Sequence, residues 1–134
     1  NFESNQLKKK INHQNFDIKN KIKLKRLINI HKPDYIFHLA AQSLVKKSYA
    51  KPSLTFETNS FGTLTLLDVL KNYTTKKICS VVIITSDKSY KNLELNRGYK
   101  EDDLLGGHDP YSASKACAEL IIQSYFNRSS IVLQ

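Results

Sequence analysis

The sequence contains the stretch SVVIIT at residues 80–85, an uninterrupted run of apolar and mostly β-branched residues. A second run of strand length, YIFHL, occupies residues 35–39, and a third, IVL, occupies residues 131–133. Continuous apolar runs without alternation are typical of strands that are buried on both faces of a parallel sheet. We therefore expect these three segments to be strands of one sheet.

The segments between these runs have helical spacing. Residues 20–31 place apolar side chains among lysines and are followed by Pro33, which indicates an amphipathic helix that ends there. Residues 52–72 begin with a proline and are also expected to be helical, as are residues 111–126. Residues 16–18 are expected to form a brief strand, and residues 40–51 and 86–110 are expected to be loops.

This alternation of strands and helices predicts an α/β fold, namely part of a doubly wound, mostly parallel sheet with helices on both faces. In such sheets, ligands bind where the strands end at their carboxyl edge. Three polar segments fall at that edge: residues 40–43, residues 86–90 and the loop before Tyr111. The loop at 86–110 is longer than most connections, and such loops tend to be functional.

Composition narrows the class of protein. The 134 residues are 40% hydrophobic and 25% charged, which suits one globular domain and excludes a chain that is disordered throughout. No apolar run approaches the roughly 20 residues of a membrane span, so no membrane partner is expected. Cys79 and Cys117 lie far apart without a cluster of histidines, so we expect two buried free thiols, no metal site and a cytoplasmic location.

The charge is uneven along the chain. The net charge is +9, of which residues 1–32 contribute +7 and the remainder +2. A basic stretch can bind nucleic acid. Here the basic residues are mostly lysines with little aromatic interleaving, which favours a solvated helix face or a site for an anionic ligand such as a nucleotide. The chain has no methionine, begins at Asn1 and ends inside an expected strand, so we expect an internal piece of a longer protein.

The motif Y-x-x-x-K occurs at Tyr111 and Lys115. Four positions on a helix put both side chains on one face, and a neighbouring ammonium favours the phenolate form that a tyrosine base needs. The motif alone is weak, because Tyr73 and Lys77 also match it in this lysine-rich chain. Context favours Tyr111, which follows Pro110 and opens a helix after a strand that ends in hydroxyl residues.

A second polar group follows the strand at 80–85, where Ser86, Asp87 and Lys88 bring a hydroxyl, a carboxylate and an ammonium together. These groups could hydrogen-bond a substrate hydroxyl and act as acid and base if they face a pocket. The alternative is a turn with a solvated ion pair. His38 is expected to be a core histidine.

Four segments together resemble a known family. They are FHLAAQ at 37–42, TNSFGT at 58–63, TSDKSY at 85–90 and GGHDPYSASK at 106–115. In order and spacing they are similar to the nucleotide-sugar 4,6-dehydratases of the extended short-chain dehydrogenase/reductases. Within that family the chain is most similar to the CDP-glucose enzymes, because Lys88 stands where other 4,6-dehydratases usually carry glutamate.

The resemblance implies catalytic roles. Tyr111 would deprotonate the sugar O4, Ser86 would hydrogen-bond near that oxygen, and hydride would pass from C4 to NAD. Lys88, or a group that it positions, would handle the C5 proton, while Asp87 would protonate the departing C6 hydroxyl. Return of hydride to C6 would give CDP-4-keto-6-deoxyglucose from CDP-glucose.

The resemblance also implies a binding site for the cofactor NAD. Lys115 would bind the nicotinamide ribose beside Tyr111, and Asn59 would give structural support to the active-site strands. The remaining cofactor residues would be Asp17 and Ile18 near the adenine and Leu39, Ala40 and Ala41 along the dinucleotide.

The chain departs from the family in one large respect. It has only four glycines and lacks the glycine-rich turn that seats the pyrophosphate on a helix N-terminus. We therefore expect residues 1–134 to be a single partial NAD-binding domain, without its first strand and without the C-terminal substrate part. This piece is expected to be inactive alone and the full-length enzyme to be a homodimer or larger. The alternatives are a dehydratase or epimerase for another nucleotide sugar, and a non-enzymatic module that binds nucleic acid.

Overall fold

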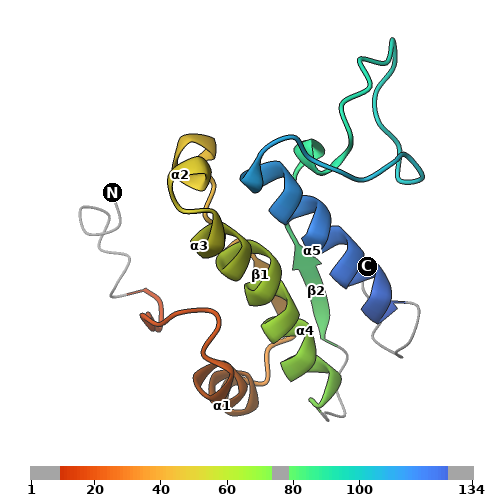
Figure 1. Cartoon of the computed structure of the whole chain (residues 1–134). Coiled ribbons are helices and arrows are strands. Elements are labelled where there is room, and N and C mark those ends of the chain that lie inside the picture. Colours follow the sequence, from red (N-terminus) through yellow and green to blue (C-terminus); the bar gives the residue numbers. More distant parts are fainter. Residues whose placement is uncertain (1–9, 74–78, 127–134) are drawn as a thin grey trace.

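The structure is a computed structural model that describes residues 10–73 and 79–126. Its helices and strands follow one another in the order helix, strand, helices, strand, helix, as Figure 1 shows. They are α1 (Lys21–His31), β1 (Tyr35–His38), α2 (Val45–Ala50), α3 (Pro52–Phe56), the π-helical turn η2 (Glu57–Phe61), α4 (Gly62–Lys71), β2 (Ser80–Ile83), the 3₁₀ turn η3 (Asp87–Ser89) and α5 (Pro110–Phe126).

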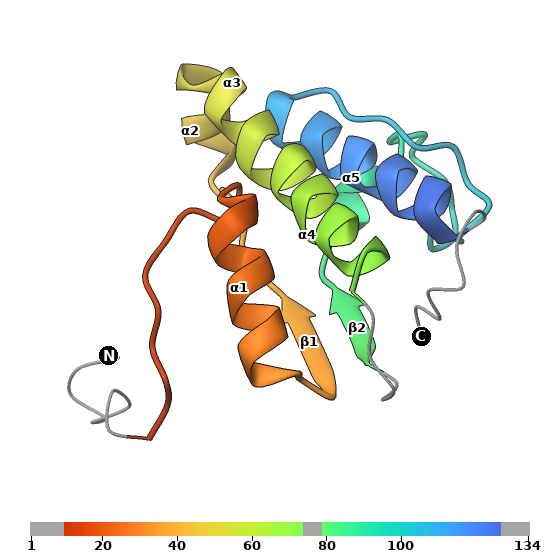
Figure 2. The ribbon, with the colours of Figure 1, turned by 90° about the horizontal axis from the view of Figure 1, so that it is seen from below.

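The two strands pair in parallel, with register running from Tyr35 opposite Ser80 to His38 opposite Ile83. Figure 2 shows both arrows pointing the same way. The hydrogen bond from Ile84 N to His38 O, 3.1 Å, continues the ladder one residue past the end of β2. Parallel pairing of these two segments confirms the prediction, whereas the strand expected at 131–133 lies outside the described residues.

The hydrophobic core lies between the strands and the helices that cover them. Its buried members come from α1, α4 and β2, and they are Leu24, Ile28, Leu66, Val69, Leu70 and Val81. The expectation that the strand at 35–39 is buried on both faces is wrong for the described part of the chain. Tyr35 and Phe37 are 68% and 63% exposed, because alternate residues of β1 point away from the face that packs on this core.

Helix α1 confirms the amphipathic pattern, since Leu24 and Ile28 are its buried residues. Its N-cap is Asn20, whose side chain accepts a hydrogen bond from Lys23 N at 3.0 Å. Lys32 ends the helix in the left-handed region, with φ of 44°, one residue before Pro33. Polar capping at one end and a left-handed residue at the other thus set the length of the helix.

The short strand expected at residues 16–18 is wrong. The Asp17 carboxylate accepts a hydrogen bond from Lys19 N at 2.9 Å, and the Asp17 carbonyl accepts one from Asn20 N at 2.8 Å. These bonds form a turn that leads into α1, because a short aspartate side chain competes with the strand ladder for backbone donors. Phe16 and Ile18 still pack against the core.

The segment expected to be a loop at 40–51 contains α2, which is a correction. Ser48 is fully buried and donates a 2.7 Å hydrogen bond to Val45 O. Six residues give too few turns for a periodic apolar pattern, so the sequence carried no helical signal there.

The long helix expected at 52–72 is confirmed, and it is interrupted by a π turn. α3, η2 and α4 run on without a break, and the Gly62 amide bonds back to Glu57 O five residues earlier. Asn59 and Ser60, adjacent in this turn, are both buried. π turns of this kind are often found at functional sites.

Among the described residues, no helix is both long and apolar enough to cross a membrane.

Candidate active site

The N-terminus of α5 carries the Y-x-x-x-K motif to the carboxyl edge of the sheet. Pro110 opens the helix, so it begins one residue earlier than expected, and Tyr111 lies in its first turn. Asp109 precedes the helix and accepts hydrogen bonds from Ser112 N at 3.0 Å and from Ser112 Oγ at 2.6 Å. Partial burial raises the pKa of Asp109, but these bonds outweigh it and keep that pKa below its usual value. A charged cap therefore fixes the start of the helix that presents Tyr111.

Gly107 brings the preceding loop against this first turn. A Cβ placed at Gly107 would lie 2.4 Å from the backbone N of Ala113 and 2.4 Å from the backbone C of Ser112. Only a residue without a side chain fits at that distance. The glycine thus allows the loop at 106–109 to pack directly on the helix that carries Tyr111.

Lys115 lies one turn after Tyr111 and is 5% exposed. Its ammonium donates a 3.2 Å hydrogen bond to the carbonyl of Ile84, just past β2. Burial lowers the pKa of Lys115, and the negative charge of Glu119 opposes that shift.

His38, at the end of β1, is buried and its Nε2 lies 3.1 Å from Thr63 Oγ1. Burial first and the charge of Lys115 second lower the pKa of His38, as expected for a neutral core histidine.

The turn η3 packs against α5 and so brings the second predicted group to the same edge. The Ser86 hydroxyl accepts a bond from Lys88 N at 3.2 Å and donates one of 3.2 Å to Asp87. Asp87 and Lys88 are exposed and, together with Ser112, line a cavity of about 370 Å³. The structure therefore brings the segments of Ser86, Asp87 and Lys88 next to the helix of Tyr111 and Lys115, although Tyr111 itself does not line this cavity.

The far wall of the same cavity belongs to the loop at 90–105. The rings of Tyr90 and Tyr99 stack at 5.4 Å between centroids, with 2° between their planes. Tyr99 also donates a 3.0 Å hydrogen bond to Asn92, and Arg97 pairs with Asp103 at 2.7 Å. Figure 1 shows this loop projecting away from the sheet. These internal contacts hold the loop in a defined conformation, so it forms an ordered wall of the cavity.

A buried hydrogen-bond network joins the segment after β1 to α5. Asn59 Oδ1 accepts from Gln42 N at 2.8 Å, while Asn59 Nδ2 donates to Gln42 O at 3.1 Å and to Ser114 Oγ at 2.9 Å. Ser60 Oγ donates to Ser114 O at 2.9 Å, so both buried residues of η2 bond to the same residue of α5. The Gln42 side chain donates to Thr55 Oγ1 at 3.1 Å. Asn59 thus ties the carboxyl end of β1 to the helix of the Y-x-x-x-K motif.

The residues predicted to line the cofactor are placed at the same edge or beside it. Leu39 is 67% exposed and Ala40 is also exposed directly after β1, while Ala41 is half-buried. Asp17 and Ile18 lie in the turn before α1, and Ile18 packs so closely on Gly62 that a Cβ there would meet it at 2.7 Å. The turn of Asp17 and the segment after β1 therefore both adjoin the helix α3–η2–α4.

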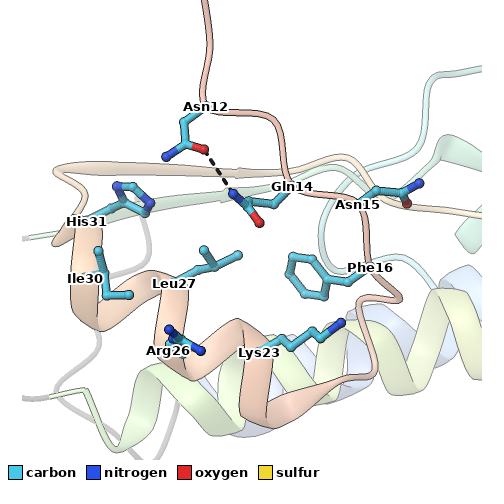
Figure 3. A pocket seen from close by; sticks show the side chains of 9 residues that line it. All are labelled: Asn12, Gln14, Asn15, Phe16, Lys23, Arg26, Leu27, Ile30 and His31. Atoms are coloured by element: carbon cyan, nitrogen blue, oxygen red, sulfur yellow. Dashed lines mark hydrogen bonds between the residues drawn. The ribbon is translucent and has the colours of Figure 1, made fainter. Parts of the chain in front are cut away.

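The cavity in Figure 3 is a different one. It measures about 410 Å³ and lies between residues 12–16 and α1, with Phe16 and Leu27 facing it from the two sides. None of the predicted site residues lines it. Among residues 10–73 and 79–126, no three His, Cys, Asp or Glu side chains are grouped so that they could hold a metal ion.

The weaker Y-x-x-x-K match differs in surroundings. Tyr73 packs against the hydrophobic core, and its partner Lys77 lies outside the described residues. The two cysteines are free thiols and half-buried, not fully buried as expected. Burial raises the pKa of the Cys79 thiol.

Sequence reasoning missed three residues that the structure places around the site, namely Gln42, Ser114 and Glu119. A signal existed for Glu119, which stands four positions after Lys115 and hence on the same helix face. Gln42 and Ser114 lie inside segments that the sequence marked, at 37–42 and 106–115, but their pairing through Asn59 was not predicted, because a buried network depends on a tertiary contact between distant segments.

Known proteins are similar to this chain over most of its length. The family model described as GDP-mannose 4,6 dehydratase matches residues 1–133. The chain is 47% identical over 111 residues to a CDP-glucose 4,6-dehydratase of Salmonella typhimurium, covering 83% of this chain and 30% of that protein. It is 33% identical over 124 residues to a CDP-paratose 2-epimerase of Salmonella typhi, covering 81% of this chain and 36% of that protein.

Among solved structures, the chain is similar to DesIV, a dTDP-glucose 4,6-dehydratase from Streptomyces venezuelae with NAD and TYD bound. The TM-score is 0.74 at 32% identity, covering 84% of this chain and 33% of that one. The fold and the relatives define a class of nucleotide-sugar dehydratases and epimerases built on a Rossmann-type sheet, which confirms the predicted fold class. The chain belongs to the GDP-mannose 4,6 dehydratase family. It spans about a third of the length of the relatives that it matches.

Proposed function

We propose that the chain is the central catalytic segment of an NAD-dependent CDP-glucose 4,6-dehydratase. The observation that carries the proposal is the packing of η3, with Asp87 and Lys88, against the helix that carries Tyr111 and Lys115. Two groups of acid–base residues that are distant in the sequence therefore adjoin one edge of a parallel sheet. The 47% identity to a CDP-glucose 4,6-dehydratase supports this sugar nucleotide over others.

The residues at this edge fit a dinucleotide. Leu39 and Ala40 leave an exposed segment with one small side chain after β1, where a flat ligand can approach the backbone. The dehydratase DesIV, to which the chain is similar, is a complex with NAD. NAD, when bound, accepts a hydride from C4 of the sugar and returns it at C6. We assign Leu39, Ala40 and Ala41 to the dinucleotide, Asp17 and Ile18 to its adenine end, and Lys115 to its ribose.

The chain's own residues would move the protons. Tyr111 accepts the proton of the sugar 4-hydroxyl, and Ser86 hydrogen-bonds near that oxygen. Lys115, one turn away, stabilises the phenolate of Tyr111 by its positive charge. After oxidation at C4, the C5 proton is acidic, and Lys88, or a group that it positions, removes it while Asp87 protonates the departing C6 hydroxyl. The same group returns a proton to C5 when hydride is added at C6. The sugar loses one water with no net oxidation, which gives CDP-4-keto-6-deoxyglucose.

The direct test is turnover of CDP-glucose by the full-length protein, followed by mass spectrometry of the sugar nucleotide. We expect a product lighter by one water. Tyr111→Phe should nearly abolish this product and leave NAD binding largely intact, because only the proton-accepting oxygen is removed. The matched control is Tyr73→Phe, which removes the hydroxyl of a tyrosine packed on the core and should be close to silent. Equal losses in the two variants would contradict the assignment of Tyr111.

A second candidate is supported by the 33% identity to a CDP-paratose 2-epimerase. An epimerase gives a product of unchanged mass, so the same assay separates the two activities. Parallel reactions with dTDP-glucose and GDP-mannose would show whether another sugar nucleotide is preferred. We expect dehydration, because Asp87 supplies an acid at the cavity.

The remaining expectations are proposals as well. We propose that the full-length enzyme is a homodimer or larger in the cytoplasm, and that residues 1–134 are a partial NAD-binding domain with little activity alone. Native mass spectrometry measures the oligomer. We also propose that the basic N-terminal part does not bind nucleic acid. Salt-sensitive retention of the protein on DNA would contradict this proposal.

A further inference from the structure

Glu119 is a half-buried carboxylate that the proposed mechanism does not use. It stands four residues after Lys115 and eight after Tyr111 on α5, so the three side chains share one helix face. The Thr85 hydroxyl, at the carboxyl end of β2, donates a hydrogen bond to the Glu119 carboxylate. Glu119 therefore joins the helix of the Y-x-x-x-K motif to the strand end from which Ser86, Asp87 and Lys88 follow.

Lys115 needs such a partner. Lys115 is 5% exposed, so its ammonium is largely removed from solvent, and the structure gives it a hydrogen bond to one carbonyl, that of Ile84. Burying a charge is expensive unless an opposite charge compensates for it. Glu119 lies one helical turn from Lys115 on the same face of α5 and is held there by the bond from Thr85. Its negative charge opposes the lowering of the Lys115 pKa by burial.

The other groups around this pair do not replace Glu119. His38 faces Lys115 from β1, and its lowered pKa keeps it neutral at neutral pH. Tyr90 faces Glu119 from the loop after η3, and burial followed by the charge of Glu119 raises its pKa, so it is neutral too. Asp87 and Lys88, on the turn packed against α5, are exposed to solvent, which screens their charges.

We propose that Glu119 is a positioning residue that keeps Lys115 charged one helical turn from Tyr111 and, through Thr85, holds α5 against the end of β2. The inference deepens the proposed function, because it concerns the residue that activates Tyr111. It attributes the protonated state of Lys115 to the carboxylate of Glu119 on the same helix.

The test uses Glu119→Gln in the full-length protein, since glutamine keeps the size and an acceptor oxygen for Thr85 but removes the charge. The pKa of Lys115 is measured by NMR of ¹³Cε-labelled lysines, with its signal assigned from Lys115→Arg. We expect the pKa of Lys115 to fall by about one unit, because an opposite charge nearby typically shifts a pKa by roughly that much or more. Glu101→Gln, which removes an exposed carboxylate from the loop, is the control and should leave it unchanged.

Two further variants separate charge from structure. Glu119→Asp keeps the charge and should restore most of the Lys115 pKa, whereas Thr85→Val removes the hydrogen bond and should lower that pKa less than Glu119→Gln does. If folded Glu119→Gln leaves the pKa of Lys115 unchanged, the inference is overturned.

The activity profile tests the proposed function separately. Turnover should fall as pH rises through the pKa of Lys115, since the phenolate of Tyr111 then loses its cation. In Glu119→Gln this alkaline limb should move to lower pH together with the NMR pKa. A shifted NMR pKa with an unmoved limb would support the role of Glu119 and would contradict the proposed role of Lys115 in catalysis.

Discussion

The Asn59 amide nitrogen donates a hydrogen bond of 2.9 Å to the Ser114 hydroxyl, across 55 positions of the sequence. The same hydroxyl donates to the carbonyl of Tyr111 at 2.7 Å. Asn59 also pairs with both the N–H and the C=O of Gln42. The buried side chain of Asn59 thus fixes the position of the segment after β1 relative to the backbone of Tyr111, the proposed base.

Asn59→Ala should destabilise the full-length protein by about 2–4 kcal/mol, because it leaves the buried N–H and C=O of Gln42 without their partner. The measurement is the midpoint of urea unfolding at constant slope. Asn72→Ala is the matched control. Asn72 is exposed and donates to Asp68 O at 2.9 Å, so its loss should change stability by no more than about 0.5 kcal/mol. Similar shifts in both variants would contradict a special role for Asn59.

Gly107→Ala should displace the loop at 106–109 from α5, because the new Cβ would lie 2.4 Å from backbone atoms of Ser112 and Ala113. We expect a loss of about 1–3 kcal/mol in stability and a lower kcat/KM, since the loop precedes Tyr111. Gly98→Ala controls for the loss of a loop glycine, as a Cβ there meets nothing within 4 Å. Differential scanning calorimetry and steady-state kinetics of the two variants check this. An unchanged kcat/KM in Gly107→Ala would show that the close approach does not position Tyr111.

Lys88→Ala should leave oxidation at C4 nearly intact and slow the loss of water by about 10²–10⁴-fold, as is typical for removal of a general base. The expected result is a build-up of the 4-keto sugar nucleotide that still carries its 6-hydroxyl, detected by mass spectrometry of a quenched single turnover. Lys91→Ala, in an exposed lysine three residues on, should behave as the unaltered enzyme. Complete loss of the keto intermediate in Lys88→Ala would place Lys88 at or before the oxidation.

The Arg97–Asp103 pair in the loop at 90–105 should titrate at acid pH. Two hydrogen bonds of 2.7 Å from Arg97, and then the N–H of Lys100, lower the pKa of Asp103 to about 2. Because the pKa is lowered in the folded state, the pair stabilises the loop fully above about pH 4, and that contribution is lost as the pH falls through about 2. ¹³C NMR of the Asp103 carboxyl should show this midpoint. In Arg97→Gln the midpoint should rise toward the ordinary value of 3.8, and a midpoint that stays near 2 would contradict the pairing.

The sequence was sufficient to predict a strand or helix where the pattern of apolar residues lies within one continuous segment. The apolar runs around Val81 and Ile36 predicted two parallel strands, and the spacing in 111–126 predicted the helix of Tyr111. Placement of Ser86, Asp87 and Lys88 near Tyr111 followed from the rule that parallel strands end at one edge. The specific roles came from resemblance to a family, and periodicity alone left Tyr111 and Tyr73 as alternatives.

Other features depend on contacts that no local pattern records. The turn at Asp17 arises because a carboxylate takes the Lys19 amide, and α2 is too short to show a period. The exposure of Tyr35 and Phe37 reflects which face of β1 packs on the core in the described residues. The network of Asn59 and the bond from Thr85 to Glu119 join segments that lie tens of residues apart.

The π turn at Glu57–Phe61 is equivalent to a single residue inserted into an otherwise regular helix. One residue advances an α-helix by about 100°, so the insertion changes the rotational phase between α3 and α4. The two halves can therefore face different neighbours, with Thr55 bonded to Gln42 on one side and Leu66 and Leu70 in the core on the other. Deleting one residue from η2 would remove this change of phase between α3 and α4. Either Thr55 would then point away from Gln42, or Leu66 and Leu70 would point away from the core.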